Sequence, residues 1–264
     1  MTRPPARSYG DTAVPNVARI YDVLLGGTDN FTADREAAGQ ILAVVPDGRA
    51  VARANRDFVQ RAVQFMAASG IAQFIDLGAG IPCGPGIHGV ARSVLPAARV
   101  VYMDADPVAC THWQALLATE DGAAVVMADI RDPGTILAHP ELNRLISFTR
   151  PMGVLLTAVL PFIGDEADAS AAAFRQRMCP GSMLAISHVT ADGTPPGVIT
   201  GLQNAYSPTG IHIAFRTRAR IGTFFGGFEL AAPGLVDVAE WPDPRGVLAS
   251  ATLRTAAGVA LAQR

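Results

Sequence analysis

The stretch Phe74-Ile75-Asp76-Leu77-Gly78-Ala79-Gly80 decides the fold. Its first two residues are apolar and predict a buried strand, which ends at Asp76. Gly78 and Gly80 follow in a turn where no Cβ atom keeps a ligand away from the backbone. The unpaired N–H groups of the next helix would point at that ligand. The heptapeptide therefore predicts a strand, a glycine turn and a helix around a ligand site.

The spacing of these glycines differs from a dinucleotide fingerprint. That fingerprint has a third glycine three positions after the second, and Cys83 occupies this position. Pro82 and Pro85 also lie in the loop. A nicotinamide-dependent oxidoreductase is therefore a disfavoured alternative. The simplest alternative is a glycine turn that only closes a core strand.

Composition narrows the class of protein. The chain has 264 residues, half of them hydrophobic, which suits one large domain or two small ones with a sizeable core. The net charge is −2, whereas a nucleic-acid binder carries a basic surplus, so we expect no nucleic-acid partner. The longest apolar run, residues 154–163, is too short to span a bilayer, so we expect no membrane partner.

The cysteines and the N-terminus indicate the compartment. Cys83, Cys110 and Cys179 lie far apart, and their spacing suggests neither a metal site nor a disulfide framework. A reduced, cytoplasmic setting fits this pattern. The first 11 residues are polar and contain no apolar signal segment.

The order of apolar patterns predicts an α/β fold. Residues 1–15 indicate a disordered or loosely attached arm, and helices are expected from Asn16, Thr32 and Asp47, each ending at a glycine, proline or polar stop. From Gly70 onward strands alternate with helices, the signature of a doubly wound sheet. Strands are expected at 73–77, 99–103, 124–128, 153–160 and 183–188, with a closing hairpin at 235–241 and 247–253 as strands six and seven.

Two N-terminal stretches are more specific than the glycine turn. They are Ala18-Arg19-Ile20-Tyr21-Asp22-Val23-Leu24-Leu25-Gly26-Gly27-Thr28-Asp29-Asn30-Phe31-Thr32-Ala33-Asp34-Arg35-Glu36 and Arg53-Ala54-Asn55-Arg56-Asp57-Phe58. Both resemble a family of bacterial S-adenosyl methyltransferases first catalogued as a domain of unknown function. The heptapeptide is also similar to the first motif of class I S-adenosylmethionine-dependent methyltransferases. The resemblance extends from about Asn16 to about Arg254.

This resemblance implies an architecture. It predicts a Rossmann-like, doubly wound, seven-stranded sheet of the class I methyltransferase type over residues 70–264. An N-terminal arm and a helical cap or lid over residues 1–69 would join it in one integrated domain. Two departures stand out, because the family usually has a lysine at Thr28 and an asparagine followed by His-Glu where this chain reads Gly86-Ile87-His88-Gly89. A cofactor-binding sensor or partner-binding protein without transferase activity therefore remains an alternative.

Asp104 is a candidate ribose ligand. It lies 24 residues after Gly80, at the carboxyl end of the second strand. Ligands in such sheets bind at these ends, where an acidic side chain accepts hydrogen bonds from ribose hydroxyls. The alternative is an exposed aspartate that begins a turn. Asp106, two residues later, is expected to cap the next helix.

The resemblance implies roles for further cofactor-binding residues. Asp129 would accept a hydrogen bond from the adenine amino group, and Ile130 would pack on the ring. Asp76 would hold the ammonium group of S-adenosylmethionine, next to Gly78 and Gly80. For both aspartates the alternative is capping of nearby backbone N–H groups.

Two arginines and two residues of a possible lid complete the set of candidate cofactor-binding residues. Arg53 and Arg56 share a helix face and could hold the methionine carboxylate, although such a face is usually solvated. Tyr21 and Asn30 could form a lid, or Tyr21 could only pack the helices against the sheet. The roles of His88 and His188 stay open.

The combined expectation is a cytoplasmic methyltransferase that uses S-adenosylmethionine and a small-molecule acceptor. No catalytic residue is assigned, since methyl transfer can rely on positioning of the acceptor. The fourth strand lacks the Asn-Pro-Pro-Tyr pattern typical of amino-group methylation of DNA bases or glutamine. The acceptor atom, the acceptor itself and the oligomeric state do not follow from the sequence.

Overall fold

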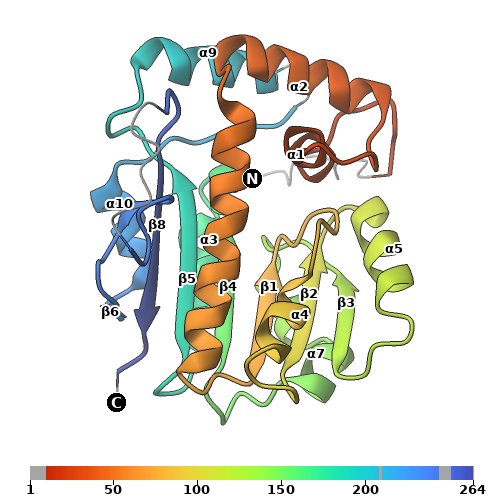
Figure 1. The fold of residues 1–264 in the computed structure, drawn as a ribbon, viewed down its shortest axis with the longest axis vertical. Coiled ribbons are helices and arrows are strands. Elements are labelled where there is room, and N and C mark those ends of the chain that lie inside the picture. Colours follow the sequence, from red (N-terminus) through yellow and green to blue (C-terminus); the bar gives the residue numbers. More distant parts are fainter. Residues whose placement is uncertain (1–9, 208–209, 244–250, 264) are drawn as a thin grey trace.

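The structure, a computed structural model, describes residues 10–207, 210–243 and 251–263. A central sheet carries helices on both faces, and a helical cap lies across one end of its strands (Figure 1). The described strands are β1 Gln73–Leu77, β2 Arg99–Asp104, β3 Ala123–Met127, β4 Gly153–Thr157, β5 Met183–Val189, β6 Glu229–Leu230, β7 Val236–Asp237 and β8 Thr255–Leu261. The helices are α1 Val17–Leu25, α2 Thr32–Val44, α3 Gly48–Ala68, α4 Ile87–Arg92, α5 Pro107–Leu116, α6 Pro133–Leu137, α7 Pro140–Leu145, α8 Ala167–Arg175, α9 Pro196–Tyr206 and α10 Arg218–Gly222, with 3-10 turns η1 Leu160–Phe162 and η3 Thr223–Phe225.

The sheet has the order β3-β2-β1-β4-β5-β8-β6, and β7 also pairs with β8. The first five strands are parallel, whereas β8 runs antiparallel to β5. This confirms the predicted doubly wound α/β sheet. The described residues form eight strands instead of the expected seven, because β6 and β7 are two short strands that both pair with β8.

The first strand of the predicted closing hairpin contains β7, which pairs antiparallel with β8, but the second strand is wrong in position. Residues 251–253 form no strand, and residues 247–250 lie outside the described part of the chain. The long antiparallel strand is β8, whose sequence Thr-Ala-Ala-Gly-Val-Ala-Leu has little apolar volume and low strand propensity. It lies between neighbours that leave little room, since a Cβ atom on Gly258 would be 3.2 Å from the Gly234 carbonyl oxygen. Tertiary packing therefore sets this strand.

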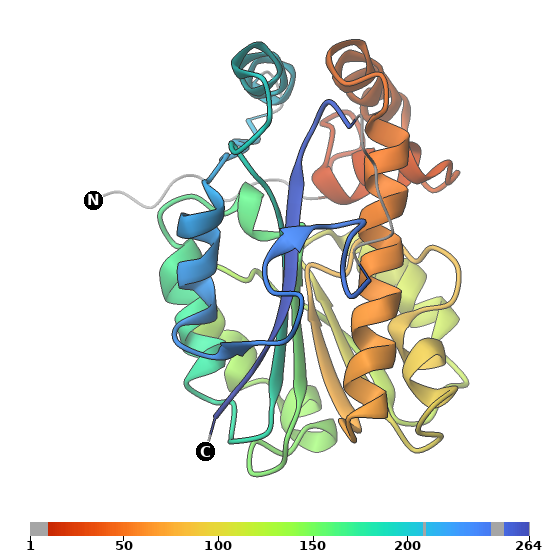
Figure 2. The same ribbon diagram turned by 60° about the vertical axis from the view of Figure 1, so that its left-hand side comes forward.

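Each face of the sheet has its own apolar core. Successive side chains alternate between faces, so Phe74 belongs to one apolar cluster with Phe58 of α3, while Ile75 belongs to another with Phe174 of α8. Figure 2 shows the sheet between these two layers of helices. Helix α3 thus covers the sheet itself, although it precedes residue 70, where the core was expected to begin. Among the described residues no helix has the length and apolar character to cross a membrane.

The cap combines segments from distant parts of the sequence. Ile20 of α1, Ile41 of α2 and Leu202 of α9 belong to a third apolar cluster, and α2 lies beside α9 in both views (Figures 1 and 2). Asn16 caps α1 as predicted, through its side-chain oxygen and the Ala18 N–H. The predicted cap at Thr32 is off by one residue, because Phe31 holds the cap position of α2.

Candidate functional site

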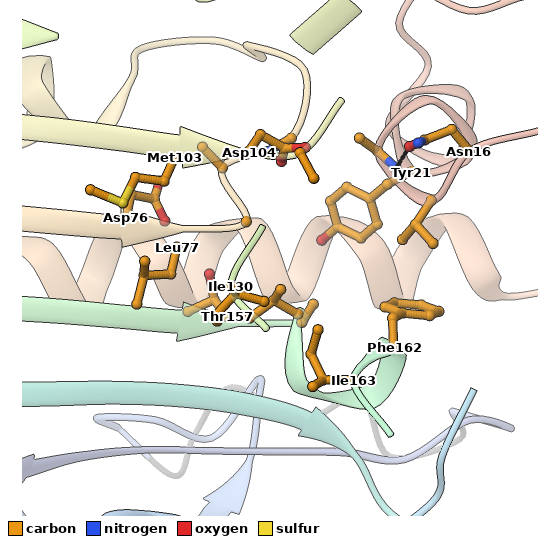
Figure 3. A pocket seen from close by; sticks show the side chains of 18 of the residues that line it. Asn16, Tyr21, Asp76, Leu77, Met103, Asp104, Ile130, Thr157, Phe162 and Ile163 are labelled. Carbon is orange, nitrogen blue, oxygen red and sulfur yellow. Dashed lines mark hydrogen bonds between the residues drawn. The ribbon is translucent and has the colours of Figure 1, made fainter. Parts of the chain in front are cut away.

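A cavity of about 390 Å³ lies at the carboxyl ends of the parallel strands, with α1 over it. Its walls come from α1, α3 and the segments that follow β1, β2, β3 and β4 (Figure 3). This volume falls in the range of small-molecule sites, roughly 300–1,000 Å³. The parallel strands place several of the predicted residues here because all of their carboxyl ends meet at one edge.

The glycine turn forms one wall of the cavity. Gly78 and Gly80 have φ values of +77° and +65°, which other residues rarely adopt. A Cβ atom on Gly78 would lie 2.6 Å from a Val159 methyl group. The Gly78 N–H donates to the Met103 oxygen at 2.8 Å, and the Gly80 N–H donates to Asp104 Oδ2 at 2.8 Å. The turn is therefore fixed to β2; glycine is required at position 78 by both φ and space, and is favoured at position 80 by φ alone.

Asp104 lies half-buried at the end of β2. Besides the Gly80 N–H, it accepts a hydrogen bond from the Asp106 N–H at 2.9 Å. Burial raises the pKa of its carboxyl group to about 6, and the charge of Asp106 adds to this. Each carboxylate oxygen keeps a further acceptor position for a ligand hydroxyl. Asp106 caps α5 through the Val108 N–H at 2.9 Å, as predicted.

Asp76 lies deeper, at the floor of the cavity, and is only 3% exposed. No described residue hydrogen-bonds to its carboxylate. Burial raises the pKa of this carboxyl group to about 6, while the Arg56 charge opposes the shift and the Asp104 charge adds to it. A buried carboxylate without a partner is costly, so a cationic group of a ligand would be stabilised here.

The segment after β3 supplies an apolar wall with a polar edge. Ile130 is 7% exposed, lines the cavity and packs into the sheet core. Asp129 also lines the cavity, and its carboxylate forms an ion pair with Arg131. The two residues thus offer an apolar surface beside a hydrogen-bond acceptor.

Tyr21 and Arg56 reach the cavity from helices. The Tyr21 hydroxyl donates to the Ala52 oxygen and accepts from Asn55 Nδ2, both at 2.9 Å. Arg56 Nη2 donates to the Cys83 oxygen at 2.8 Å, whereas its Nε is buried without a hydrogen-bond partner. This Nε–H is a donor that an anionic ligand group could satisfy.

Two predicted residues do not line the cavity. Asn30 donates through Nδ2 to Asp22 Oδ2 at 2.8 Å and to the Gly27 oxygen at 3.0 Å, which closes the turn between α1 and α2. Arg53 is exposed on α3. Neither side chain therefore joins the other predicted site residues at this cavity. Membership of a motif did not reveal which side chains point inward.

Neither histidine in question lines the cavity. His88 Nδ1 lies 2.7 Å from the Tyr102 hydroxyl oxygen. His188 is fully buried, donates through Nδ1 to the Val189 oxygen at 2.6 Å and accepts from Arg216 Nη1 at 2.8 Å. Burial lowers the pKa of His188 to about 4, so it stays neutral. Both histidines hold local structure.

Sequence reasoning missed two supporting residues. Asn55 is 5% exposed on the inner face of α3, where Val51, Phe58 and Val59 at helical spacing would have revealed it. Trp113 donates from Nε1 to the Gly80 oxygen at 2.9 Å and so supports the glycine turn. No sequence signal predicts that contact, because it joins residues 33 positions apart.

The donor set defines the ligand that fits. The site offers the Asp76 carboxylate without a hydrogen-bond partner, further acceptor positions on Asp104, and the apolar side chain of Ile130. It also offers the Arg56 Nε–H, which has no hydrogen-bond partner. S-adenosylmethionine carries the matching groups, namely an ammonium, two ribose hydroxyls, an adenine ring and a carboxylate.

Comparison with known proteins agrees with this fit. A family profile described as S-adenosyl methyltransferase matches residues 5–263. The chain is 38% identical to a candidate methyltransferase from Thermobifida fusca YX, with all of both chains covered and a TM-score of 0.90. It is 37% identical to a DUF574 family protein from Streptomyces avermitilis MA-4680, over 96% of this chain and 99% of that one, also with a TM-score of 0.90.

More distant structures share the fold. An O-methyltransferase family protein from Burkholderia thailandensis is 15% identical over 82% of this chain and 61% of that one, with a TM-score of 0.50. No curated protein sequence matches. Because the profile covers nearly the whole chain and the cavity fits the methyl donor, the protein belongs to the S-adenosyl methyltransferase family and is an S-adenosylmethionine-dependent methyltransferase of the class I fold.

Proposed function

We propose that this enzyme binds S-adenosylmethionine across the carboxyl ends of β1, β2 and β3 and methylates a small-molecule acceptor held under the cap. One observation carries the proposal: Asp76, Asp104 and the glycine turn converge on a single cavity that α1 covers. We further propose that the enzyme acts in the cytoplasm, consistent with its three free cysteines.

Each residue at this edge has a proposed role. Asp104 accepts hydrogen bonds from the ribose hydroxyls, and Asp76 faces the ammonium group. Ile130 packs on the adenine ring, with Asp129 as acceptor for its amino group. Arg56 donates its unpaired Nε–H to the methionine carboxylate. Gly78 and Gly80 allow the backbone to approach the cofactor.

The sulfonium of the bound cofactor supplies an electrophilic methyl group. The residues of this chain then need only hold the acceptor in line with that methyl group and keep water out. Positioning of this kind can lower a barrier by several kcal/mol, roughly 7–11 in the best intramolecular cases. The absence of an assigned catalytic base is consistent with such a mechanism.

The role of Asp104 can be tested with Asp104→Asn. Hydrogen bonds to charged groups contribute about 1.5–3 kcal/mol, so we expect the dissociation constant for S-adenosylhomocysteine to rise roughly 10- to 150-fold. Isothermal titration calorimetry measures it directly. The control is Asp121→Asn, at an exposed residue beyond the opposite end of the sheet, which should leave the affinity unchanged. Equal affinity of the wild type and Asp104→Asn would contradict the proposal.

A further inference from the structure

The cavity extends past the part proposed for the cofactor. In the sheet order β3-β2-β1-β4, the proposed cofactor residues lie at the carboxyl ends of the first three strands, apart from Arg56 on α3. The remaining part lies past β4, where Phe162 and Ile163 are seen in Figure 3. We call this part the acceptor end, and its walls are the side chains of Val17, Tyr21, Val159, Phe162, Ile163 and Ile211.

None of the six acceptor-end side chains is charged. The charged side chains that line the cavity lie outside this set of six, and several of them are paired with an opposite charge. Arg19 faces Asp106, with 3.2 Å between Nε and Oδ2, and Arg131 pairs with Asp129. Arg56 is close enough to Tyr21 to interact with it electrostatically, but it is proposed to hold the methionine carboxylate, whereas Asp76 and Asp104 flank the glycine turn. A charged acceptor would therefore lose its water at this end without gaining an uncommitted charged partner among the described residues.

No described side chain at this end can take up a proton near neutral pH. The Tyr21 hydroxyl is bonded to Ala52 and Asn55, and burial raises its pKa to about 12. His188 is sealed between Val189 and Arg216. The residues outside the described ranges contain no aspartate, glutamate, histidine, cysteine or lysine, so the sequence offers no further base there.

One polar side chain borders this end. Thr157, the last residue of β4, lines the cavity, and no described residue hydrogen-bonds to its hydroxyl. It can orient an acceptor through one hydrogen bond without supplying charge or removing a proton near neutral pH.

We infer that the acceptor is a small, uncharged, mainly apolar molecule that is methylated on a neutral nitrogen, such as a ring nitrogen of an azaarene or an aryl amine. The inference rests on the proposed function. The nitrogen lone pair forms the new C–N bond while the C–S bond breaks and its electron pair returns to sulfur. The positive charge passes to the methylated nitrogen, and an N–H product then loses its proton to water.

Other nucleophiles fit less well. A carboxylate or an alkyl ammonium group would enter the acceptor end charged and unpaired. A neutral hydroxyl is a weak nucleophile until a base removes its proton, and the acceptor end provides none. A neutral nitrogen needs neither a counter-charge nor a base before it attacks.

The test uses probes of similar bicyclic size on the full-length protein saturated with S-adenosylhomocysteine. Quinoline and 2-naphthylamine are neutral nitrogen probes at pH 8, whereas 2-naphthoate and 2-naphthylmethylammonium are charged. We expect calorimetry to give dissociation constants at least tenfold lower for the neutral probes, equivalent to about 1.4 kcal/mol. Equal or tighter binding of a charged probe would overturn the inference.

The transferred methyl group tests the choice of nitrogen. The protein, a nitrogen probe or 2-naphthol, and S-adenosylmethionine with a labelled methyl group are incubated, and the products are identified by mass spectrometry. We expect label on nitrogen. Label on the naphthol oxygen only, or no label on nitrogen probes that bind, would overturn the assignment.

A carboxylate introduced at the acceptor end provides a second test of the acceptor class. Phe162→Asp or Ile211→Asp adds a carboxylate at the acceptor end, and either variant that still binds S-adenosylhomocysteine should bind 2-naphthylmethylammonium at least tenfold more tightly than the wild type. Leu116→Asp, on an exposed α5 residue, is the matched control and should not change probe binding. Failure of the wild type to bind S-adenosylhomocysteine would refute the proposed function. Cofactor binding without preference among probes would refute only the acceptor class.

Discussion

At the scale of single residues, Asp76 and Asp104 both carry carboxyl groups whose pKa is raised to about 6, chiefly by burial. In the unfolded chain an aspartate has a pKa of about 4. Between about pH 4 and pH 6 the folded protein therefore binds more protons than the unfolded one, so its stability falls as the pH rises through this window. Above pH 6 both carboxyl groups are ionised, so the protein carries the full loss of stability that these buried charges cause.

This linkage predicts that Asp76→Asn stabilises the free protein. At pH 7.5 the variant avoids a buried charge, and two pKa units correspond to an upper bound of about 3 kcal/mol. Differential scanning calorimetry should show a higher Tm than wild type at pH 7.5 and a much smaller gain at pH 4.5. The control Asp121→Asn should show no such pH-dependent gain. A Tm for Asp76→Asn below that of the wild type at pH 7.5 would contradict the argument.

Cofactor affinity should depend on pH in the opposite direction. The ionised carboxylates accept hydrogen bonds and attract the ammonium group, so the affinity for S-adenosylhomocysteine should be full at pH 7.5 and fall as the pH drops through about 6. Titrations between pH 5 and 8 measure this. An affinity that is constant down to pH 5 would show that neither carboxyl group contributes.

Position along the sequence predicted the acidic residues well. Asp76 lies near the carboxyl end of β1, Asp104 is the last residue of β2 and Asp129 follows β3, so the parallel sheet brings all three to one cavity. Asn30 and Arg53 were chosen because they lie in motifs, and neither side chain points at the cavity. Which face of a helix or turn a side chain occupies depends on packing.

At the scale of elements, Arg19 attaches α1 to the rest of the molecule. Its side chain is 1% exposed, lies 3.2 Å from Asp106 and 3.6 Å from Asp34, and donates to the Val14 oxygen at 3.0 Å. It therefore joins α1 to α2 and to the start of α5, two residues after Asp104. Removal of one partner from a buried ion pair leaves uncompensated charge.

Arg19→Met should consequently lower the free energy of unfolding by about 3 kcal/mol. Urea denaturation measures the loss. Arg35→Met provides the comparison, because Arg35 is exposed and its hydrogen bonds to Asn30 and Thr32 lie at the surface, so its loss should stay within about 0.5 kcal/mol. Similar losses for the two variants would mean that Arg19 does not hold the cap in place.

Element prediction succeeded where apolar volume was high. The five parallel strands match within a few residues because valine, isoleucine and leucine form continuous runs between turn residues. Strand β8 was missed because its alanines and glycine carry little signal. The position of α9 in the cap also could not be foreseen, since its contact with α2 joins segments that are distant in sequence.

At the scale of the whole molecule, charge and shape limit the partners. The net charge is −2, which leaves no basic surplus for a phosphate track. We expect no binding to duplex DNA tighter than about 10⁻⁴ M in a filter assay at physiological salt. Tight binding that weakens steeply with salt would contradict the proposal of a small-molecule acceptor.

The central claim is that Asp76, Asp104 and the glycine turn form the cofactor site under a cap made of α1, α2 and α9. A crystal structure of the full-length protein with S-adenosylhomocysteine tests it most directly. We predict both ribose hydroxyls within hydrogen-bond distance of the Asp104 carboxylate, the ammonium group above Asp76 and the adenine ring against Ile130. A cofactor bound elsewhere, or turned so that its ribose lies away from Asp104, would contradict the account.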